Sequence, residues 1–97
     1  MKPVALHPAA ETEFAEAAEF YLARNPRLAV EFTESVEEAF RFVRENVEAG
    51  TPVRGALRSL LVRRFPYRVI YREEESRIYV LAIAHHRRRP SYWRRRK

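Results

Sequence analysis

The sequence predicts a single α+β domain over residues 1–97, in which an N-terminal strand precedes an antiparallel helical hairpin that packs on a twisted antiparallel β-sheet. Three observations support this prediction. Apolar residues recur at helical spacing through residues 8–47, and the pattern changes to β-rich runs after residue 55. A chain of 97 residues can also fill one hydrophobic core but not two. The expected order is βααβββ, followed by a basic tail over residues 85–97.

The N-terminal strand and the first helix meet at His7-Pro8. Residues 2–6 are short and mildly apolar, and proline is well tolerated in the first turn of a helix, so the strand ends here and the helix begins at Pro8. The apolar positions predicted for its buried face are Phe14, Ala18, Tyr21 and Leu22, and the glutamates expected on its solvated face are Glu11, Glu13, Glu16 and Glu19.

The second helix is predicted to follow almost at once. Asn25 is a favourable N-cap residue and Pro26 suits the first helical position. Gly50, before Thr51-Pro52, is the expected glycine stop after the last turn. The core stripe of this helix is Phe32, Val36, Ala39, Phe40, Val43 and Val47.

Three strands are predicted in the second half of the chain, and they form an antiparallel meander. Their ranges are 57–65, 67–72 and 77–84, with Pro66 and the polar turn 73–76 between them. If side chains alternate strictly, both faces of the last strand are largely apolar, which predicts a central strand with its second face partly covered. The first two strands carry one face studded with arginine.

The charge is unevenly distributed along the chain. The formal net charge is +6, but residues 1–53 sum to −5 and residues 54–97 sum to +11. The last thirteen residues hold seven basic side chains and no acid, and 17 of the 19 basic residues are arginine. Because arginine pairs bidentately with phosphate and carboxylate, an anionic partner is expected.

Composition also limits the chemistry. The chain contains no cysteine, which excludes disulfide scaffolds and thiolate zinc sites and fits a reducing compartment, so the cytoplasm is the expected location. No apolar run is long enough to span a membrane. Neither a cofactor nor a metal site is expected, because His85 and His86 have no acidic residue or cysteine nearby in sequence to complete a ligand set.

The segments RSLLVRRFPYRVIY and IYVLAIAHHRRRPSYW, together with the acidic hairpin before them, resemble the RelE/ParE superfamily of toxins from type II toxin–antitoxin modules. The resemblance covers nearly the whole chain. It implies a growth-arresting toxin that a cognate antitoxin neutralises. Two activities are open within the superfamily: a RelE-like toxin is a metal-independent, ribosome-dependent mRNA endonuclease, whereas a ParE-like toxin inhibits DNA gyrase and is not an enzyme. Outside the superfamily, a small basic nucleic-acid-binding protein is the alternative.

If the protein is a nuclease, the resemblance implies where its site lies. The residues that match the catalytic positions of RelE-like nucleases, or could supply their acid or base, are Arg68, His86, Arg87 and Tyr92. The catalytic lysines of those nucleases have no counterpart, since no lysine lies between Lys2 and Lys97, and this favours a ParE-like or diverged member. The further residues expected to contact nucleic acid or another target are Arg58, Arg64, Arg88, Arg89, Trp93, Arg94, Arg95 and Arg96.

The tail has two compatible interpretations. Arginines interleaved with Tyr92 and Trp93 suit a nucleic acid, whose phosphates they would neutralise, and equally suit an acidic helical segment of the antitoxin. The two aromatic residues could instead dock the tail on the sheet. Binding of either anionic partner requires the arginines to converge on one cationic hollow.

Overall fold

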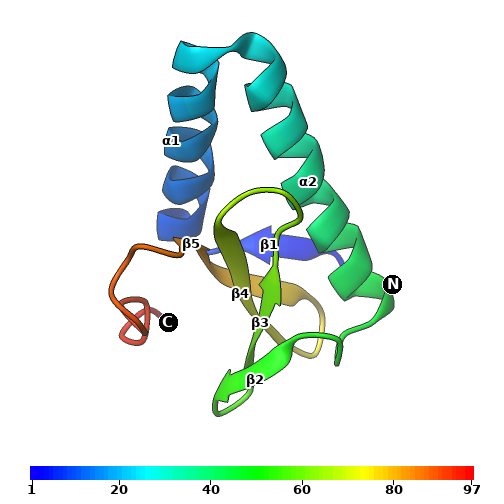
Figure 1. The fold of residues 1–97 in the computed structure, drawn as a ribbon. Helices are drawn as coiled ribbons and strands as arrows, with labels where there is room; N and C mark the ends of the chain where they lie inside the picture. The colour runs from blue at the N-terminus through cyan, green and yellow to red at the C-terminus, as the bar shows by residue number, and fades with distance from the viewer.

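The computed structural model describes residues 1–97 and contains two helices packed on one face of a five-stranded mixed sheet (Figure 1). In chain order the elements are β1 (Val4–Leu6), α1 (Pro8–Arg24), α2 (Pro26–Glu45), β2 (Thr51–Arg54), β3 (Leu57–Leu61), β4 (Tyr67–Glu73) and β5 (Ile78–His85). The strands lie in the order β1-β5-β4-β3-β2. The α+β class is confirmed. The sheet is mixed because β1 pairs in parallel with β5, while β2 to β5 form the antiparallel meander.

Both helices begin where the sequence predicts. The His7 Nδ1 atom accepts a hydrogen bond from the Ala9 amide at 3.0 Å, and the Asn25 side-chain oxygen accepts one from the Arg27 amide at 2.9 Å. These two caps satisfy amides that the first helical turn leaves unpaired. Neither helix is long and apolar enough to cross a membrane.

The predicted stop of the second helix at Gly50 is wrong, because α2 already ends at Glu45 with Asn46 as its C-cap. Gly50 is instead required by a close approach. A Cβ atom there would lie 2.7 Å from the Tyr71 hydroxyl oxygen, which accepts a hydrogen bond from the Gly50 amide and donates one to the Val47 carbonyl. Tyr71 therefore ties the loop after α2 to the sheet.

The main core lies between the helices and the sheet. The predicted stripe of α2 is confirmed from Phe32 to Val43: Phe32, Val36, Ala39 and Val43 are buried, and Phe40 packs against the cluster they form. Val47 also packs against this cluster, but it lies beyond the end of α2. The prediction for α1 is wrong at Leu22, whose side chain is 54% exposed. Leu22 lies near the tip of the hairpin, which extends beyond the sheet and has no strand beneath it (Figure 1).

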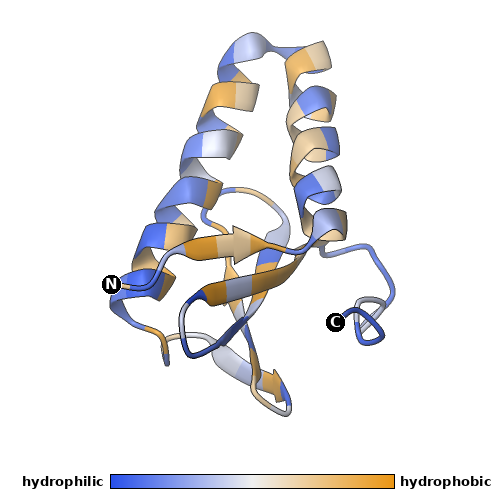
Figure 2. Cartoon of the chain, turned by 180° about the vertical axis from the view of Figure 1, so that it is seen from behind, coloured by the Kyte–Doolittle hydropathy of each residue, from blue (hydrophilic) through white to orange (hydrophobic).

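A second apolar cluster lies on the opposite face of the sheet. It contains Ile70 from β4, Leu81, Ala82 and Ala84 from β5, and Trp93 from the C-terminal segment. β5 is central and buried on both faces, as predicted. Hydrophobic residues follow β1 and β5 in Figure 2, whereas the C-terminal segment is mostly hydrophilic.

The prediction of strictly alternating side chains along β5 is wrong at one position. Ile70 pairs with Ala82 and the next residue, Tyr71, pairs with Val80, so Leu81 forms a bulge. The bulge shifts the alternation by one residue, and Ile83 therefore joins Ile78 and Val80 in the core beneath the helices.

Two further differences concern β2 and β3. β2 was not predicted from the sequence. It is a strand of four exposed residues at the edge of the sheet, where Pro52 is tolerated because an edge needs no further donor. β3 ends at Leu61 and not at residue 65. Arg64, in the turn that follows, has a positive φ of 71°, which a regular strand does not contain.

Candidate functional site

A groove of about 700 Å³ lies on the face of the sheet opposite the helices. Its floor is formed by side chains of β3, β4 and β5, among them Ser59, Arg68 and Ala84. Its walls are β2 on one side and the segment after β5 on the other. Three arginines and two histidines line the groove and no acidic residue does: the basic residues are Arg68, His85, His86, Arg88 and Arg89.

Arg68 lies in the middle of this floor. Its Nη1 atom donates to the Ser59 hydroxyl at 3.1 Å, and it has no carboxylate within 4.0 Å. The Ser59 side chain is buried at the centre of β3, where it holds one edge of the guanidinium. Arg68 is exposed, so its other donors are free for a ligand.

The two histidines differ in their surroundings. The His85 Nδ1 atom accepts a hydrogen bond from the Arg87 amide at 3.0 Å, and its ring packs edge-on against Tyr67 at 4.9 Å. Burial, and then the charges of Arg87 and His86, lower the pKa of His85, which makes it a neutral residue that caps the turn. His86 is exposed, and its backbone amide bonds the Pro66 carbonyl at 2.9 Å.

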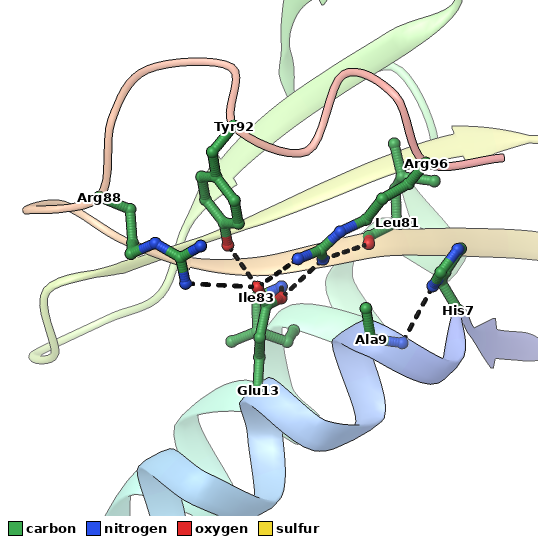
Figure 3. Close-up of polar contacts among 8 residues, drawn as sticks. All are labelled: His7, Ala9, Glu13, Leu81, Ile83, Arg88, Tyr92 and Arg96. Atoms are coloured by element: carbon green, nitrogen blue, oxygen red, sulfur yellow. Dashed lines mark hydrogen bonds and ion pairs between the residues drawn. The ribbon is translucent and has the colours of Figure 1, made fainter.

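Beside the groove, the carboxylate of Glu13 on α1 fastens the C-terminal segment (Figure 3). It accepts hydrogen bonds from the Ile83 amide at 2.9 Å, from the Tyr92 hydroxyl at 2.6 Å, and from the Arg96 Nη1 and Nη2 atoms at 3.0 and 2.8 Å. The Arg96 Nη1 atom also donates to the Leu81 carbonyl at 3.1 Å. We call this arrangement the Glu13 clasp. It joins α1, β5 and the tail.

The clasp changes the acidity of its members. Burial raises the pKa of Glu13, but the hydrogen bonds from Arg96, Tyr92 and the Ile83 amide together outweigh it, so the pKa lies below its ordinary value. Burial and the hydrogen bond to Glu13 raise the pKa of Tyr92 well above its ordinary range. Tyr92 is therefore a neutral donor whose proton is already engaged.

The structure brings some of the sequence-predicted site residues together and separates others. Those that line the groove are Arg68, His86, Arg88, Arg89, Tyr92 and Trp93. Arg94 and Arg95 line an adjoining hollow of about 410 Å³, which shares Arg89, Ser91 and Tyr92 with the groove. Trp93 is only 5% exposed and docks the tail on the sheet.

Four predicted residues line neither the groove nor the hollow. Arg58 donates to the carbonyls of Glu48 and Gly50 at 3.1 and 2.9 Å, and Arg64 pairs with Glu31 of α2 at 3.4 Å. Arg96 belongs to the clasp, and Arg87 is exposed in the turn after β5. The functional roles of all twelve residues stay predictions.

Glu13 was predicted on the solvated face of the first helix, and this prediction is wrong. The sequence contains a signal for its true position: the small apolar residues Ala10 and Ala17 lie at i−3 and i+4 from Glu13, and both are buried in the structure. Small apolar residues at those spacings put Glu13 on the edge of the core face, where a carboxylate needs partners.

Comparisons with known proteins agree with this architecture. The family model described as "ParE toxin of type II toxin-antitoxin system, parDE" matches residues 4–90. A solved structure, from the chromosomal ParDE toxin–antitoxin system of P. aeruginosa, superimposes with a TM-score of 0.75 at 20% identity, covering 88% of this chain and 96% of that one, which shows a shared fold. No curated protein matches the sequence.

The family match decides between the superfamily and the unrelated alternative. It covers the helical hairpin, the whole sheet and the first residues of the segment after β5, and it ends before Tyr92 and Arg96 of the clasp. The toxin role expected from the sequence is confirmed, and the type II system to which such a toxin belongs includes an antitoxin partner. The chain belongs to the ParE toxin family of type II toxin–antitoxin systems.

Proposed function

We propose that this toxin arrests growth by binding DNA gyrase and inhibiting it, and that it does not cleave RNA. The observation that carries this proposal is the state of Tyr92. This residue matches the C-terminal tyrosine of RelE-like nucleases, yet its hydroxyl donates to Glu13 at 2.6 Å and its pKa is raised. A phenol held in this way is a poor general acid or base.

The rest of the groove also lacks a complete set of groups for RNA cleavage. Metal-independent cleavage needs a base for the 2′-hydroxyl, an acid for the leaving oxygen and cations at the phosphate. Arg68 supplies a cation, but the His85 Nδ1 atom accepts a hydrogen bond from the Arg87 amide at 3.0 Å, so this ring nitrogen is engaged in the turn and not open to a substrate hydroxyl. No lysine lies between Lys2 and Lys97. These residues favour binding over proton transfer.

The same charges support a specific kind of antitoxin contact. The groove has three arginines and no acidic residue, so an acidic helical segment of the antitoxin would be electrostatically complementary to it. An antitoxin seated there would cover the surface that the target uses. The absence of cysteine supports action in the cytoplasm, where thiols are kept reduced.

Two assays on the purified toxin test the proposal. We expect it to inhibit supercoiling by purified gyrase, and we expect primer extension on translated mRNA to show no new breaks. Tyr92→Phe adds a stringent comparison, because a nuclease that uses the phenol would lose activity, whereas a gyrase inhibitor that keeps its fold would not. Unimpaired supercoiling together with breaks in translated message would contradict the proposal and favour a RelE-like activity.

A further inference from the structure

The groove and the adjoining hollow share part of their lining, and both are lined by arginine. The groove of about 700 Å³ and the hollow of about 410 Å³ share Arg89, Ser91 and Tyr92, and no acidic residue lines either one. We call their five arginines the cationic track: Arg68, Arg88, Arg89, Arg94 and Arg95.

The charges of the track are almost uncompensated. Arg68, Arg89, Arg94 and Arg95 have no carboxylate within 4.0 Å, and Arg88 approaches Glu13 only at 3.9 Å. By contrast, Arg63, Arg72 and Arg77 each pair with a glutamate, and the hollow that Arg41 lines beside α2 also holds four glutamates. Clustered cations repel one another and make the local electrostatic potential positive, so this surface attracts an anion.

We propose that the cationic track binds the phosphodiester backbone of DNA, so that the toxin contacts the DNA held by gyrase as well as the enzyme. This inference rests on the proposed function, because the DNA is taken to be the segment that gyrase holds. A nucleic acid strand carries a charge at each nucleotide, which suits five arginines spread over two connected hollows. A single carboxylate or phosphate would neutralise only part of the track.

The two aromatic residues beside the track, Tyr92 and Trp93, indicate how the DNA is recognised. The Tyr92 ring is covered by the Arg88 guanidinium at 3.8 Å and faces that of Arg96 at 5.1 Å, and Trp93 is buried. Neither ring offers a free face on which a base could stack. Contacts are therefore confined to the phosphates, and binding is independent of base sequence.

The experiment compares two double variants that lose the same charge. Arg68→Gln/Arg89→Gln removes two exposed arginines of the track. Arg27→Gln/Arg41→Gln is the matched control, since both of its residues are exposed on α2 and lie outside the track. Fluorescence anisotropy measures the affinity of each protein for labelled DNA, single-stranded and duplex, and for RNA of the same length, over a range of salt concentrations.

We expect the wild type and the control to bind DNA alike. The track variant should bind about tenfold or more weakly at low salt, and its slope of log K against log salt should fall by about 1.4 for single strands and about 1.8 for duplex, for two lost phosphate contacts. Unlabelled DNA of unrelated sequence should compete equally well. An equal loss in the control variant would overturn the inference, because net charge alone would then explain the binding.

Two further arms separate the possible anions. A polyglutamate peptide tests an acidic protein segment, which is proposed above to cover the same groove and should therefore compete with DNA: if the wild type binds polyglutamate but not DNA at the same charge concentration, the track is a peptide site only and the inference fails. Clear preference for RNA over DNA would also overturn it.

Supercoiling assays on the same proteins separate this inference from the proposed function. We expect the track variant to lose gyrase inhibition along with DNA affinity. If it loses DNA affinity but inhibits gyrase fully, the DNA contact has no role and the inference fails, while gyrase remains the target. If the wild type binds DNA but leaves gyrase unaffected, the proposed function fails and the DNA affinity of the track stands.

Discussion

The Glu13 clasp and the cationic track lie side by side and use the same residue type in opposite ways. In the clasp, the Arg96 side chain is 18% exposed and its guanidinium is bound by a carboxylate and a backbone carbonyl. In the track, Arg89 is exposed and has no acidic partner. The comparison shows that the local supply of acid, and not arginine content, separates arginines that hold the fold from arginines free to meet a target.

The most severe change to the clasp is Glu13→Ala. It leaves Arg96 without its carboxylate and the Ile83 amide without an acceptor. We expect the free energy of unfolding to fall by about 2–4 kcal/mol, since removing one partner of a largely buried pair costs more than the pair itself contributes. Urea denaturation followed by Trp93 fluorescence measures it.

Glu16→Ala is the matched control for that change. Glu16 is an exposed residue of the same helix that forms no ion pair, so its removal should alter the free energy of unfolding by less than about 0.5 kcal/mol. Equal losses for the two variants would mean that the clasp does not stabilise the protein.

Tyr92→Phe removes one hydrogen bond from the clasp and leaves the ring in place. We expect a loss of about 1.5 kcal/mol in urea denaturation, the lower end for a hydrogen bond to a charged acceptor, because the ring packing is retained. Gyrase inhibition should persist under conditions where the variant is folded. Loss of inhibition at unchanged stability would show that the hydroxyl contacts the target.

The clasp should also make stability depend on pH. Because the folded pKa of Glu13 lies below its ordinary value of 4.5, its contribution is fully present above that pH and is lost as the pH falls through the folded pKa. The stability difference between the wild type and Glu13→Gln should therefore shrink on acidification. The pKa of Glu74, lowered by hydrogen bonds from Arg77 and Arg72, affects both proteins equally and cancels in the difference. A difference that stays constant would contradict the assignment.

The smallest expected effect on stability is that of Arg89→Gln in the track. The side chain has no partner to lose, so the free energy of unfolding should change by less than about 0.5 kcal/mol. Inhibition of gyrase should nevertheless weaken. If the stability change exceeded that of Tyr92→Phe, the contrast between clasp and track would be wrong.

Much of the fold was predictable because its signals are local. Asn25-Pro26 is a cap and a first-turn residue whatever surrounds it, and the stripe from Phe32 to Val47 has helical spacing on its own. The failures occurred where distant residues decide. β2 is an exposed edge strand that exists because β3 lies beside it, and Gly50 is fixed by Tyr71, which lies 21 residues later.

In the candidate site too, some features follow from local sequence and others depend on residues far apart in the chain. The basic tail, the abundance of arginine and the absence of catalytic lysines are properties of the sequence. Composition and short-range periodicity determined these features, the two helix starts and the buried face of α2. Which arginines are free was decided by the tertiary structure alone. Arg96 and Glu13 are 83 residues apart in sequence, and they form an ion pair because the fold places α1 beside β5 and the C-terminal segment. The strength of an ion pair depends on the distance between the charges in space, which no periodicity along the chain encodes.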